Sequence, residues 1–245
     1  MPFEGFVISK WRSRMKQVLM LLLYWGWRHR CPICGGNFRE WLNCGLEHRR
    51  KGKCPRCSSV ERHRLIILYL KNKTDFFKSP LKVLHVAPEF CFVKMFKNAK
   101  NLEYQTADLN SLYADIHVDI TNMAIIPDNS YDVVLCSHVL EHIQEDLKAM
   151  REIRRILKPN GWAILQVPIR KGTKTFEDPS VISSEMRRKL FGQEDHVRMY
   201  GDDYKNRLES AGFKVMIDSY AAVLGEAQAK KFGLDLSEDI CFCTK

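Results

Sequence analysis

Four cysteines near the start of the chain have the spacing of a metal site. Cys31 and Cys34 form one C-x2-C pair, and Cys54 and Cys57 form a second pair after 19 intervening residues. Two such pairs supply the four thiolates of a tetrahedral structural Zn²⁺ site. Since four sulfur ligands leave no position for water, the spacing predicts a structural zinc ion and disfavours a catalytic one.

The remaining cysteines indicate a reducing compartment. The chain has nine cysteines in all. Cys44 lies between the two pairs and, together with His48, is a less well spaced alternative ligand. The others fall in apolar runs, as buried reduced thiols do, and are Cys91, Cys136, Cys241 and Cys243. No secretory disulfide framework is evident in the sequence, so we expect the protein in the cytoplasm.

A histidine-containing segment, residues 193–200, is the strongest candidate for acid–base chemistry. It reads QEDHVRMY and lies in a long charged stretch between predicted strands. Histidine is the side chain best suited to proton transfer near neutral pH. The catalytic candidates are, in order, His196, His138 and Tyr200. Asp195 would orient a histidine and Arg198 would hold an anion; the alternative is a polar loop with one hydrogen-bonded histidine.

A second polar cluster follows the second cysteine pair. Glu61, Arg62, His63 and Arg64 succeed one another in the sequence. Such a run is typical of the solvated face of a helix. Arg62 and His63 are also candidates for binding an anionic substrate, and the sequence leaves both interpretations open.

The elements that must position these groups alternate between strands and helices from residue 81 onward. Short apolar runs predict seven strands, over residues 81–88, 102–109, 114–120, 131–139, 162–169, 212–220 and 240–245. Helices are predicted over 60–73, 92–99 and 145–157. This alternation indicates an α/β fold with a mostly parallel, doubly wound sheet. Two stretches, 171–203 and 221–238, interrupt it, and we expect them to shape a substrate site.

The positive charge is concentrated in the N-terminal third. Residues 1–73 contain 16 Lys and Arg against 4 Asp and Glu, whereas residues 74–245 contain 23 against 25. A basic patch attracts phosphates, anionic glycans or an anionic membrane surface. The charge does not distinguish among these partners.

One apolar run, residues 18–27, raises the question of whether the protein contacts a membrane. It reads VLMLLLYWGW between basic flanks, and is roughly half as long as a bilayer-spanning helix requires. No small-residue cleavage site follows it, which disfavours a signal peptide. We expect a helix that packs on the rest of the protein. The alternative is an interfacial helix, which would make the protein peripheral to the inner membrane face.

These patterns divide the chain into four predicted parts. Residues 1–27 form a basic, apolar N-terminal segment, and 28–64 form a zinc ribbon. Residues 65–80 form a linker helix. Residues 81–245 form the catalytic domain.

The segment 81–166 resembles the class I S-adenosylmethionine-dependent methyltransferases. The matching pieces, in chain order, are VLHVAPE (83–89), YQTADL (104–109), HVDIT (117–121), DNSYDVVLCSHVLEHI (128–143) and RRILKPNGWAILQVP (154–168). With the cysteine ribbon before them and FGQEDHVRMYG after them, the chain resembles type 11 methyltransferases with an N-terminal zinc ribbon. The resemblance implies a Rossmann-like, seven-stranded methyltransferase sheet with S-adenosylmethionine as cofactor.

The resemblance also implies the cofactor-binding residues. They are His85, Ala87, Glu89, Asp108, Asp119, Ile120, Ser137 and His138. Asp108 would accept hydrogen bonds from the ribose hydroxyls, and Asp119 would accept one from the adenine amine, with Ile120 beside the ring. Turn formation is the alternative for both aspartates. The family's cofactor loop normally carries two glycines, and this sequence has none there.

A different motif overlaps this block. His138, Glu141 and His142 fit the H-x-x-E-H pattern of inverted zinc peptidases. That pattern belongs on a long helix with a third ligand further along. Here it leaves a predicted strand, so we favour the methyltransferase interpretation.

The expected function is methyl transfer from S-adenosylmethionine to a polar acceptor, a hydroxyl of a glycan or small molecule. One alternative is RNA methylation, in which the basic ribbon docks the nucleic acid. The other is a cofactor-binding protein without catalysis. No feature of the sequence points to DNA.

Overall fold

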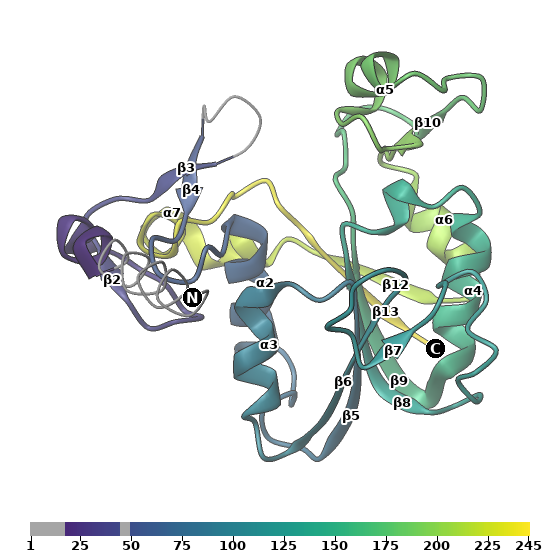
Figure 1. Cartoon of the computed structure of the whole chain (residues 1–245), viewed down its shortest axis with the longest axis horizontal. Helices are drawn as coiled ribbons and strands as arrows, with labels where there is room; N and C mark the ends of the chain where they lie inside the picture. Colours follow the sequence, from purple (N-terminus) through teal and green to yellow (C-terminus); the bar gives the residue numbers. More distant parts are fainter. Residues whose placement is uncertain (1–17, 45–49) are drawn as a thin grey trace, which may run out of the picture. The chain divides into compact units, whose positions relative to one another are not determined.

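The computed structural model describes residues 18–44 and 50–245 (Figure 1). The chain forms two compact units. Met1–Asp75 and Ser219–Asp239 make up the first, here called the N-terminal unit. Phe76–Asp218 and Ile240–Lys245 make up the second, here called the sheet unit.

The sheet unit is built on the seven-stranded sheet that the sequence predicts. Its strand order is β12-β13-β9-β8-β5-β6-β7. The strands are β5 (Leu81–Val86), β6 (Leu102–Asp108), β7 (Ile116–His117), β8 (Tyr131–Ser137), β9 (Leu157–Gln166), β12 (Lys214–Asp218) and β13 (Ile240–Thr244). β13 pairs antiparallel with both β9 and β12, and the other pairs are parallel. This is the predicted Rossmann-like α/β fold, although the third predicted strand is only two residues long.

Helices cover both faces of this sheet. α4 (Asp146–Ile156) and α6 (Tyr204–Ser210) lie on one face and α3 (Phe90–Lys97) lies on the other (Figure 1). α4 buries Met150 and Ile153 completely against the core, because its apolar residues recur at helical spacing. On the other face, Phe92 and Phe96 of α3 stack on each other with ring centroids 5.3 Å apart. The strands are therefore held between two apolar layers.

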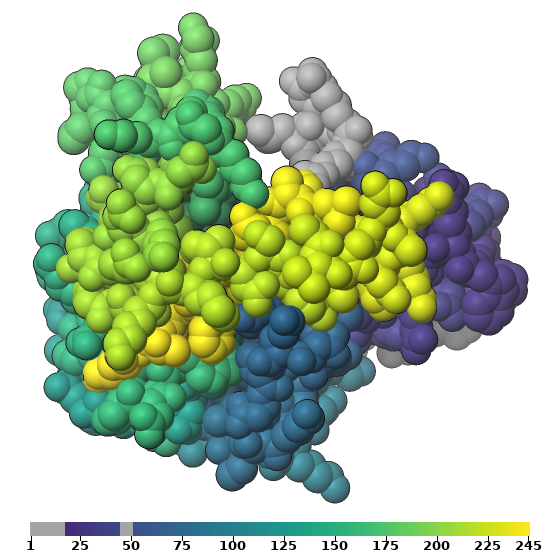
Figure 2. All heavy atoms as spheres, turned by 180° about the vertical axis from the view of Figure 1, so that it is seen from behind, coloured from purple at the N-terminus to yellow at the C-terminus, as the bar shows by residue number. Residues whose placement is uncertain are grey.

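The first interruption of the alternation, residues 171–203, has secondary structure of its own. β10 (Phe176–Glu177) pairs antiparallel with β11 (Arg198–Met199), and α5 (Ser184–Phe191) lies between them in sequence. The Ser183 hydroxyl caps α5 at its start, and Gly192 ends it with a left-handed φ of 92°. This segment projects as the green spheres of Figure 2. It starts shortly after β9, so it is connected to the carboxyl edge of the sheet.

The second interruption lies in the other unit. It forms α7 (Tyr220–Phe232) and belongs with residues 1–75. Arg64 explains why: its guanidinium donates to the carbonyls of Phe232 and Gly233, both at 2.6 Å, and lies 4.2 Å from the centre of the Trp41 ring. The compact units therefore divide the chain differently from the predicted boundaries, which made residues 81–245 a single domain.

The rest of the N-terminal unit includes two short hairpins and the helix α2. β1 (Trp25–Arg30) pairs with β2 (Asn37–Phe38), β3 (Leu42–Cys44) pairs with β4 (Arg50–Lys53), and α2 (Glu61–Asn72) follows. Each cysteine pair starts a similar turn. The amide of Gly35 donates to the Cys31 carbonyl, and the amide of Ser58 donates to the Cys54 carbonyl. Gly35 and Ser58 both have positive φ, 72° and 59°, so the two turns have matching geometry.

The apolar run at the start of the described chain is exposed. Residues 18–24 are helical. Its exposed large side chains are Val18, Leu19, Leu22, Leu23, Trp25 and Trp27. The expected packing of this helix on the rest of the protein therefore does not include these side chains. In residues 18–44 and 50–245, no helix has the length and apolarity that a bilayer crossing requires. The basic residues before Val18 lie outside the described part of the chain.

Candidate functional site

The strand order reverses between β5 and β8, where doubly wound sheets form their binding crevice. β5 is flanked by β6 on one side and by β8 on the other. The predicted cofactor residues all follow the carboxyl ends of these strands or of β7. His85, Ala87 and Glu89 lie at the end of β5 and after it, Asp108 at the end of β6, and Asp119 and Ile120 after β7. Ser137 ends β8 and His138 follows it.

A buried histidine braces the loop after β5. His85 is 1% exposed, and its Nδ1 lies 2.8 Å from the Tyr104 hydroxyl. Its Nε2 lies 2.6 Å from Oε2 of Glu89. In a neutral ring that donates from Nε2 to the Glu89 carboxylate, Nδ1 accepts a hydrogen bond from the Tyr104 hydroxyl, whose pKa burial raises. The Nε2–H then donates to the Glu89 carboxylate, which fixes the position of Glu89 beside the crevice.

Ala87 adopts a conformation that usually belongs to glycine. Its φ is +47°, and the left-handed region costs an L-residue roughly 1–2 kcal/mol. This is where the family's loop normally has a glycine. The chain therefore keeps the backbone path of a glycine loop without the residue, and the small methyl group is what permits it.

Changes at Ala87 are expected to follow this geometry. Ala87→Val should lower stability by about 1–3 kcal/mol, because a β-branched residue is strained at positive φ. Ala87→Gly should change it by less than about 1 kcal/mol, since relief of strain is offset by the entropy of the unfolded chain. Urea denaturation measures both. Ala114→Val, at a residue outside the positive-φ set, is the control, and an equal loss there would contradict the explanation.

The two predicted cofactor aspartates shape their own loops. Oδ1 of Asp108 accepts hydrogen bonds from the amides of Asn110 and Ser111, both at 2.8 Å. Oδ1 of Asp119 accepts one from the amide of Thr121 at 2.8 Å. Both carboxylates are thus fixed turn formers at the crevice edge, and ribose and adenine recognition stays a prediction.

The residues after β8 turn toward a histidine cluster. The backbone of His138 has a positive φ of 56°. Its Nδ1 lies 3.1 Å from Oε1 of Glu141, a fully buried residue in η2 (Leu140–His142). The rings of His142 and His196 meet edge to face with centroids 4.8 Å apart. The structure therefore brings together His138 and His196, the two leading catalytic candidates, through Glu141 and His142.

His196 is buried and has a defined tautomer. It is 2% exposed, and its Nδ1 lies 2.9 Å from the carbonyl oxygen of Phe191. A carbonyl only accepts, so Nδ1 carries the hydrogen. Nε2 is then a base, and within the described residues it has no hydrogen-bond partner. The histidine beside the Asp195 carboxylate is His142, whose Nδ1 lies 3.3 Å from it.

The side chains of Arg198 and Tyr200 are both buried, and both make polar contacts with neighbouring segments of the sheet unit. Arg198 donates to the carbonyls of Leu140, Ile143 and Gln144 around η2 and to Glu177. The Tyr200 hydroxyl, whose pKa burial raises, donates to Asp146 at 2.6 Å. Their predicted roles toward an acceptor stay predictions, and what the geometry supports is a positioning role.

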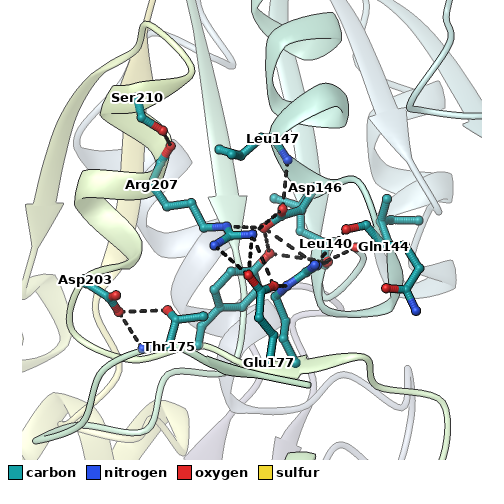
Figure 3. Close-up of polar contacts among 12 residues, drawn as sticks. Leu140, Gln144, Asp146, Leu147, Thr175, Glu177, Asp203, Arg207 and Ser210 are labelled. Atoms are coloured by element: carbon teal, nitrogen blue, oxygen red, sulfur yellow. Dashed lines mark hydrogen bonds and ion pairs between the residues drawn. The ribbon is translucent and has the colours of Figure 1, made fainter. Parts of the chain in front are cut away.

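The sequence analysis missed the centre of this network, Asp146 (Figure 3). Asp146 is 1% exposed, and Arg207 pairs with both of its oxygens, at 2.6 and 2.8 Å. That pairing raises the pKa of Arg207. Asp146 opens α4, where an acidic residue also suits the helix dipole, so the sequence offered an ordinary explanation. Only the fold places Arg207 of α6 opposite it.

The four predicted metal ligands form one cluster in the N-terminal unit, here called the four-cysteine cluster. The sulfur atoms of Cys31 and Cys57 are 3.6 Å apart, and those of Cys34 and Cys54 are 3.7 Å apart. Four ligands 2.3 Å from a tetrahedral ion would be about 3.8 Å apart. Hydrogen bonds among the four thiols lower the pKa of Cys31 and raise those of Cys34 and Cys54. These sulfur separations fit a tetrahedral metal site, and the four cysteines could hold an ion.

The two predicted anion-binding residues of the N-terminal unit, Arg62 and His63, have different surroundings. His63 is 8% exposed, and its Nδ1 accepts from the Val60 amide at the start of α2. Arg62 is half-buried on the first turn of the same helix. His63 thus contributes to capping the helix, and an anion-binding role for either residue stays a prediction.

Comparisons with known proteins agree with this architecture. Residues 81–165 match the family model described as a methyltransferase domain. No curated protein matches the chain. The [4+2]-cyclase SpnF has a similar fold, with a TM-score of 0.50 at 14% identity, covering 94% of this chain and 93% of that one.

Two further solved structures align less completely. An S-adenosylmethionine-dependent methyltransferase from Archaeoglobus fulgidus gives a TM-score of 0.48 at 16% identity, covering 74% of this chain and 93% of that one. A methyltransferase-like protein from Bacillus halodurans gives 0.41 at 20% identity, covering 57% of this chain. The alignment spans only 62% of the length of the Bacillus halodurans protein.

Residues 81–165 match the methyltransferase domain model, and the seven-stranded sheet that contains them is consistent with a methyltransferase domain. Residues 1–75 of the N-terminal unit, which carry the four-cysteine cluster, precede the matched segment in the chain, and residues 219–239 of the same unit follow it.

Proposed function

We propose that the protein transfers a methyl group from S-adenosylmethionine to a hydroxyl of a glycan or other polar small molecule. When bound, the cofactor supplies an activated methyl group on a sulfonium. Asp108 would accept hydrogen bonds from its ribose hydroxyls, and Asp119 would accept one from the adenine amine. His85 and Ala87 would shape the loop that faces its methionine part.

The proposal of a hydroxyl acceptor depends on one observation, which is that Nε2 of His196 has no hydrogen-bond partner within the described residues. A hydroxyl must lose its proton as its oxygen bonds to the methyl carbon, and a positioned base contributes roughly 10²–10⁴-fold. Within the described residues, Nε2 of His196 is a buried basic atom without a hydrogen-bond partner. His138, at the end of β8, lies on the cofactor side of the same cluster, which supports a shared site.

His196→Asn is expected to separate binding from turnover. Asparagine can still donate to the Phe191 carbonyl but has no basic atom at the position of Nε2. Calorimetry should give a cofactor affinity within about threefold of wild type, while release of S-adenosylhomocysteine should fall by about 10²–10⁴-fold. Turnover is followed over a panel of hydroxyl-bearing sugars and small acids, with His117→Gln as a surface control.

Two results would count against this assignment. Unchanged turnover in His196→Asn would show that the histidine is not needed. Cofactor binding without turnover on any acceptor would instead favour a cofactor-binding protein without catalysis.

We further propose that the four-cysteine cluster holds a structural Zn²⁺ ion. All four sulfur atoms lie within 4.8 Å of one another, and Cys31 and Cys54 are fully buried. A closed set of four thiolates stabilises a small fold and leaves no position for chemistry. The ion would therefore hold the two turns of the N-terminal unit together.

RNA remains the second candidate acceptor because of the exposed charge on the N-terminal unit. Arg28, Arg30, Arg39 and Arg56 are all exposed, and this third of the chain carries the positive excess. Phosphate contacts give a steep fall of affinity with salt. A steep salt dependence of binding to structured RNA, together with methylated RNA as product, would replace the small-molecule proposal.

A further inference from the structure

Glu141 is a carboxylate that the fold buries without pairing it fully. The residue is 0% exposed, and neither side-chain oxygen has a hydrogen-bond partner within the described part of the chain. Nδ1 of His138 lies 3.1 Å from Oε1 without making a hydrogen bond. A buried charged carboxylate is costly unless a cation or hydrogen-bond donors compensate it, so this arrangement indicates a missing positive partner.

Two histidines complete a possible ligand set around this carboxylate. One ligand atom each from Glu141, His142 and His196 lies within 4.8 Å of the others. Nε2 of His196 is unpartnered within the described residues and, because Nδ1 donates to the Phe191 carbonyl, it carries a lone pair. A histidine whose other nitrogen donates to a backbone carbonyl is the usual form of a metal ligand.

We propose that Glu141, His142 and His196 form a second metal site, which binds a divalent transition-metal ion through two imidazoles and one carboxylate. Ligands 2.0–2.2 Å from a shared ion are separated by at most about 4.4 Å. The three atoms lie within 4.8 Å of one another, near that limit, and the His142 ring, 32% exposed, is the ligand with the most room to adjust. Imidazole and carboxylate ligands suit Zn²⁺, Fe²⁺, Co²⁺ or Mn²⁺.

The backbone around these side chains is held in place from both segments. The amide of Val197 donates to the carbonyl of Glu141 at 2.9 Å, which places His196 beside η2. Arg198, 2% exposed, donates to the carbonyls of Leu140 and Gln144 on either side of Glu141 and His142. The three ligands are thus preorganised by contacts that involve none of their own side chains.

The chemical use of this site rests on the proposed methyl transfer, but it replaces the role of His196 as a free base in that proposal. Three protein ligands leave coordination positions for substrate, unlike the closed four-cysteine cluster. An acceptor hydroxyl bound there would lose its proton to water more readily, while its oxygen bonds to the methyl carbon and the carbon–sulfur bond breaks. His196 would then act as a ligand and not as a free base. Turnover does not distinguish these two roles, whereas counting metal ions does.

The test counts zinc per chain by equilibrium dialysis against about 10 µM free Zn²⁺, without cofactor or acceptor. We expect two equivalents for wild type and His117→Gln, and one for Glu141→Gln and His142→Ala. His142→Ala changes a partly exposed side chain, and circular dichroism establishes that both variants are folded. When Co²⁺ is used in place of Zn²⁺, the two variants should bind one ion fewer than wild type. The ion that they lack should show no sulfur charge-transfer absorption in wild type, because its ligands are nitrogen and oxygen.

Two outcomes would overturn the proposal. One equivalent in wild type would mean that His138 compensates Glu141 and that no second ion binds. Two equivalents in folded Glu141→Gln and His142→Ala would place the second ion elsewhere. Neither outcome bears on methyl transfer, which the turnover of His196→Asn tests separately.

Discussion

Replacing Cys54 with serine is expected to unfold the N-terminal unit while the methyltransferase domain keeps its cofactor affinity. Cys54 is fully buried, and its sulfur lies 3.7 Å from that of Cys34. Structural zinc contributes roughly 10–16 kcal/mol in small zinc-binding peptides, as much as the whole stability of a typical domain. A small unit of short hairpins and helices has little core with which to replace that contribution.

The loss should appear first in the contacts that depend on the second cysteine turn. Arg64 donates to the carbonyl of Ser59 in that turn and to the end of α7. When the turn opens, α7 loses this buried anchor. Limited proteolysis should therefore cut within residues 50–75 and 219–239 before it cuts the sheet unit.

Calorimetry with S-adenosylmethionine measures the cofactor affinity, and limited proteolysis measures the loss of structure in the N-terminal unit. Cys44→Ser, a cysteine outside the four-cysteine cluster, is the matched control and should behave like wild type. An equal loss of N-terminal structure and of cofactor affinity in Cys54→Ser would show that the two units depend on each other. Addition of a zinc chelator to wild type should reproduce the variant.

The second large effect is expected at Asp146. Asp146→Ala should lower the free energy of unfolding of the sheet unit by about 3 kcal/mol, because breaking a buried ion pair leaves an uncompensated charge. Arg207 would lose its two-point partner and Tyr200 its acceptor. The value lies at the low end of the usual range because Arg207 is 22% exposed and keeps contacts with Glu177.

Urea denaturation of the sheet unit measures this loss. Asp128→Ala is the control, because Asp128 also pairs with an arginine, Arg155, but is 66% exposed; it should cost less than about 1 kcal/mol. Similar losses at both positions would show that burial of the pair is not what matters. We also expect faster proteolysis within residues 171–203 in Asp146→Ala, because Tyr200 follows β11 directly and its hydroxyl contacts Asp146.

The sheet was predictable from the sequence because its strands are local patterns. Runs such as YDVVLCS are apolar at nearly every position, as strands buried on both faces must be. The N-terminal ligands were predictable for a similar reason, since a C-x2-C pair brings two sulfur atoms together within a single turn. The third strand was predicted too long, because only two of its residues pair with β6.

The histidine and glutamate cluster was only partly predictable. His138, Glu141 and His142 were recognised as a motif because they are neighbours in the chain. Their approach to His196 depends on a backbone hydrogen bond between Val197 and Glu141, 56 residues apart in sequence. Asp195 was expected to orient a histidine, but sequence proximity did not indicate that the histidine beside its carboxylate would be His142.

The sequence alone determined the class of sheet, the four cysteines that cluster and the methyltransferase resemblance, because each depends on short patterns in the chain. The tertiary structure decided which polar groups are buried together. It turned Arg198 and Tyr200 toward the network of Asp146, joined residues 219–239 to the N-terminal unit, and left Glu141 enclosed beside two histidines. Such placements arise from packing between distant segments, where burial makes each unpaired charge costly, and no local pattern encodes them.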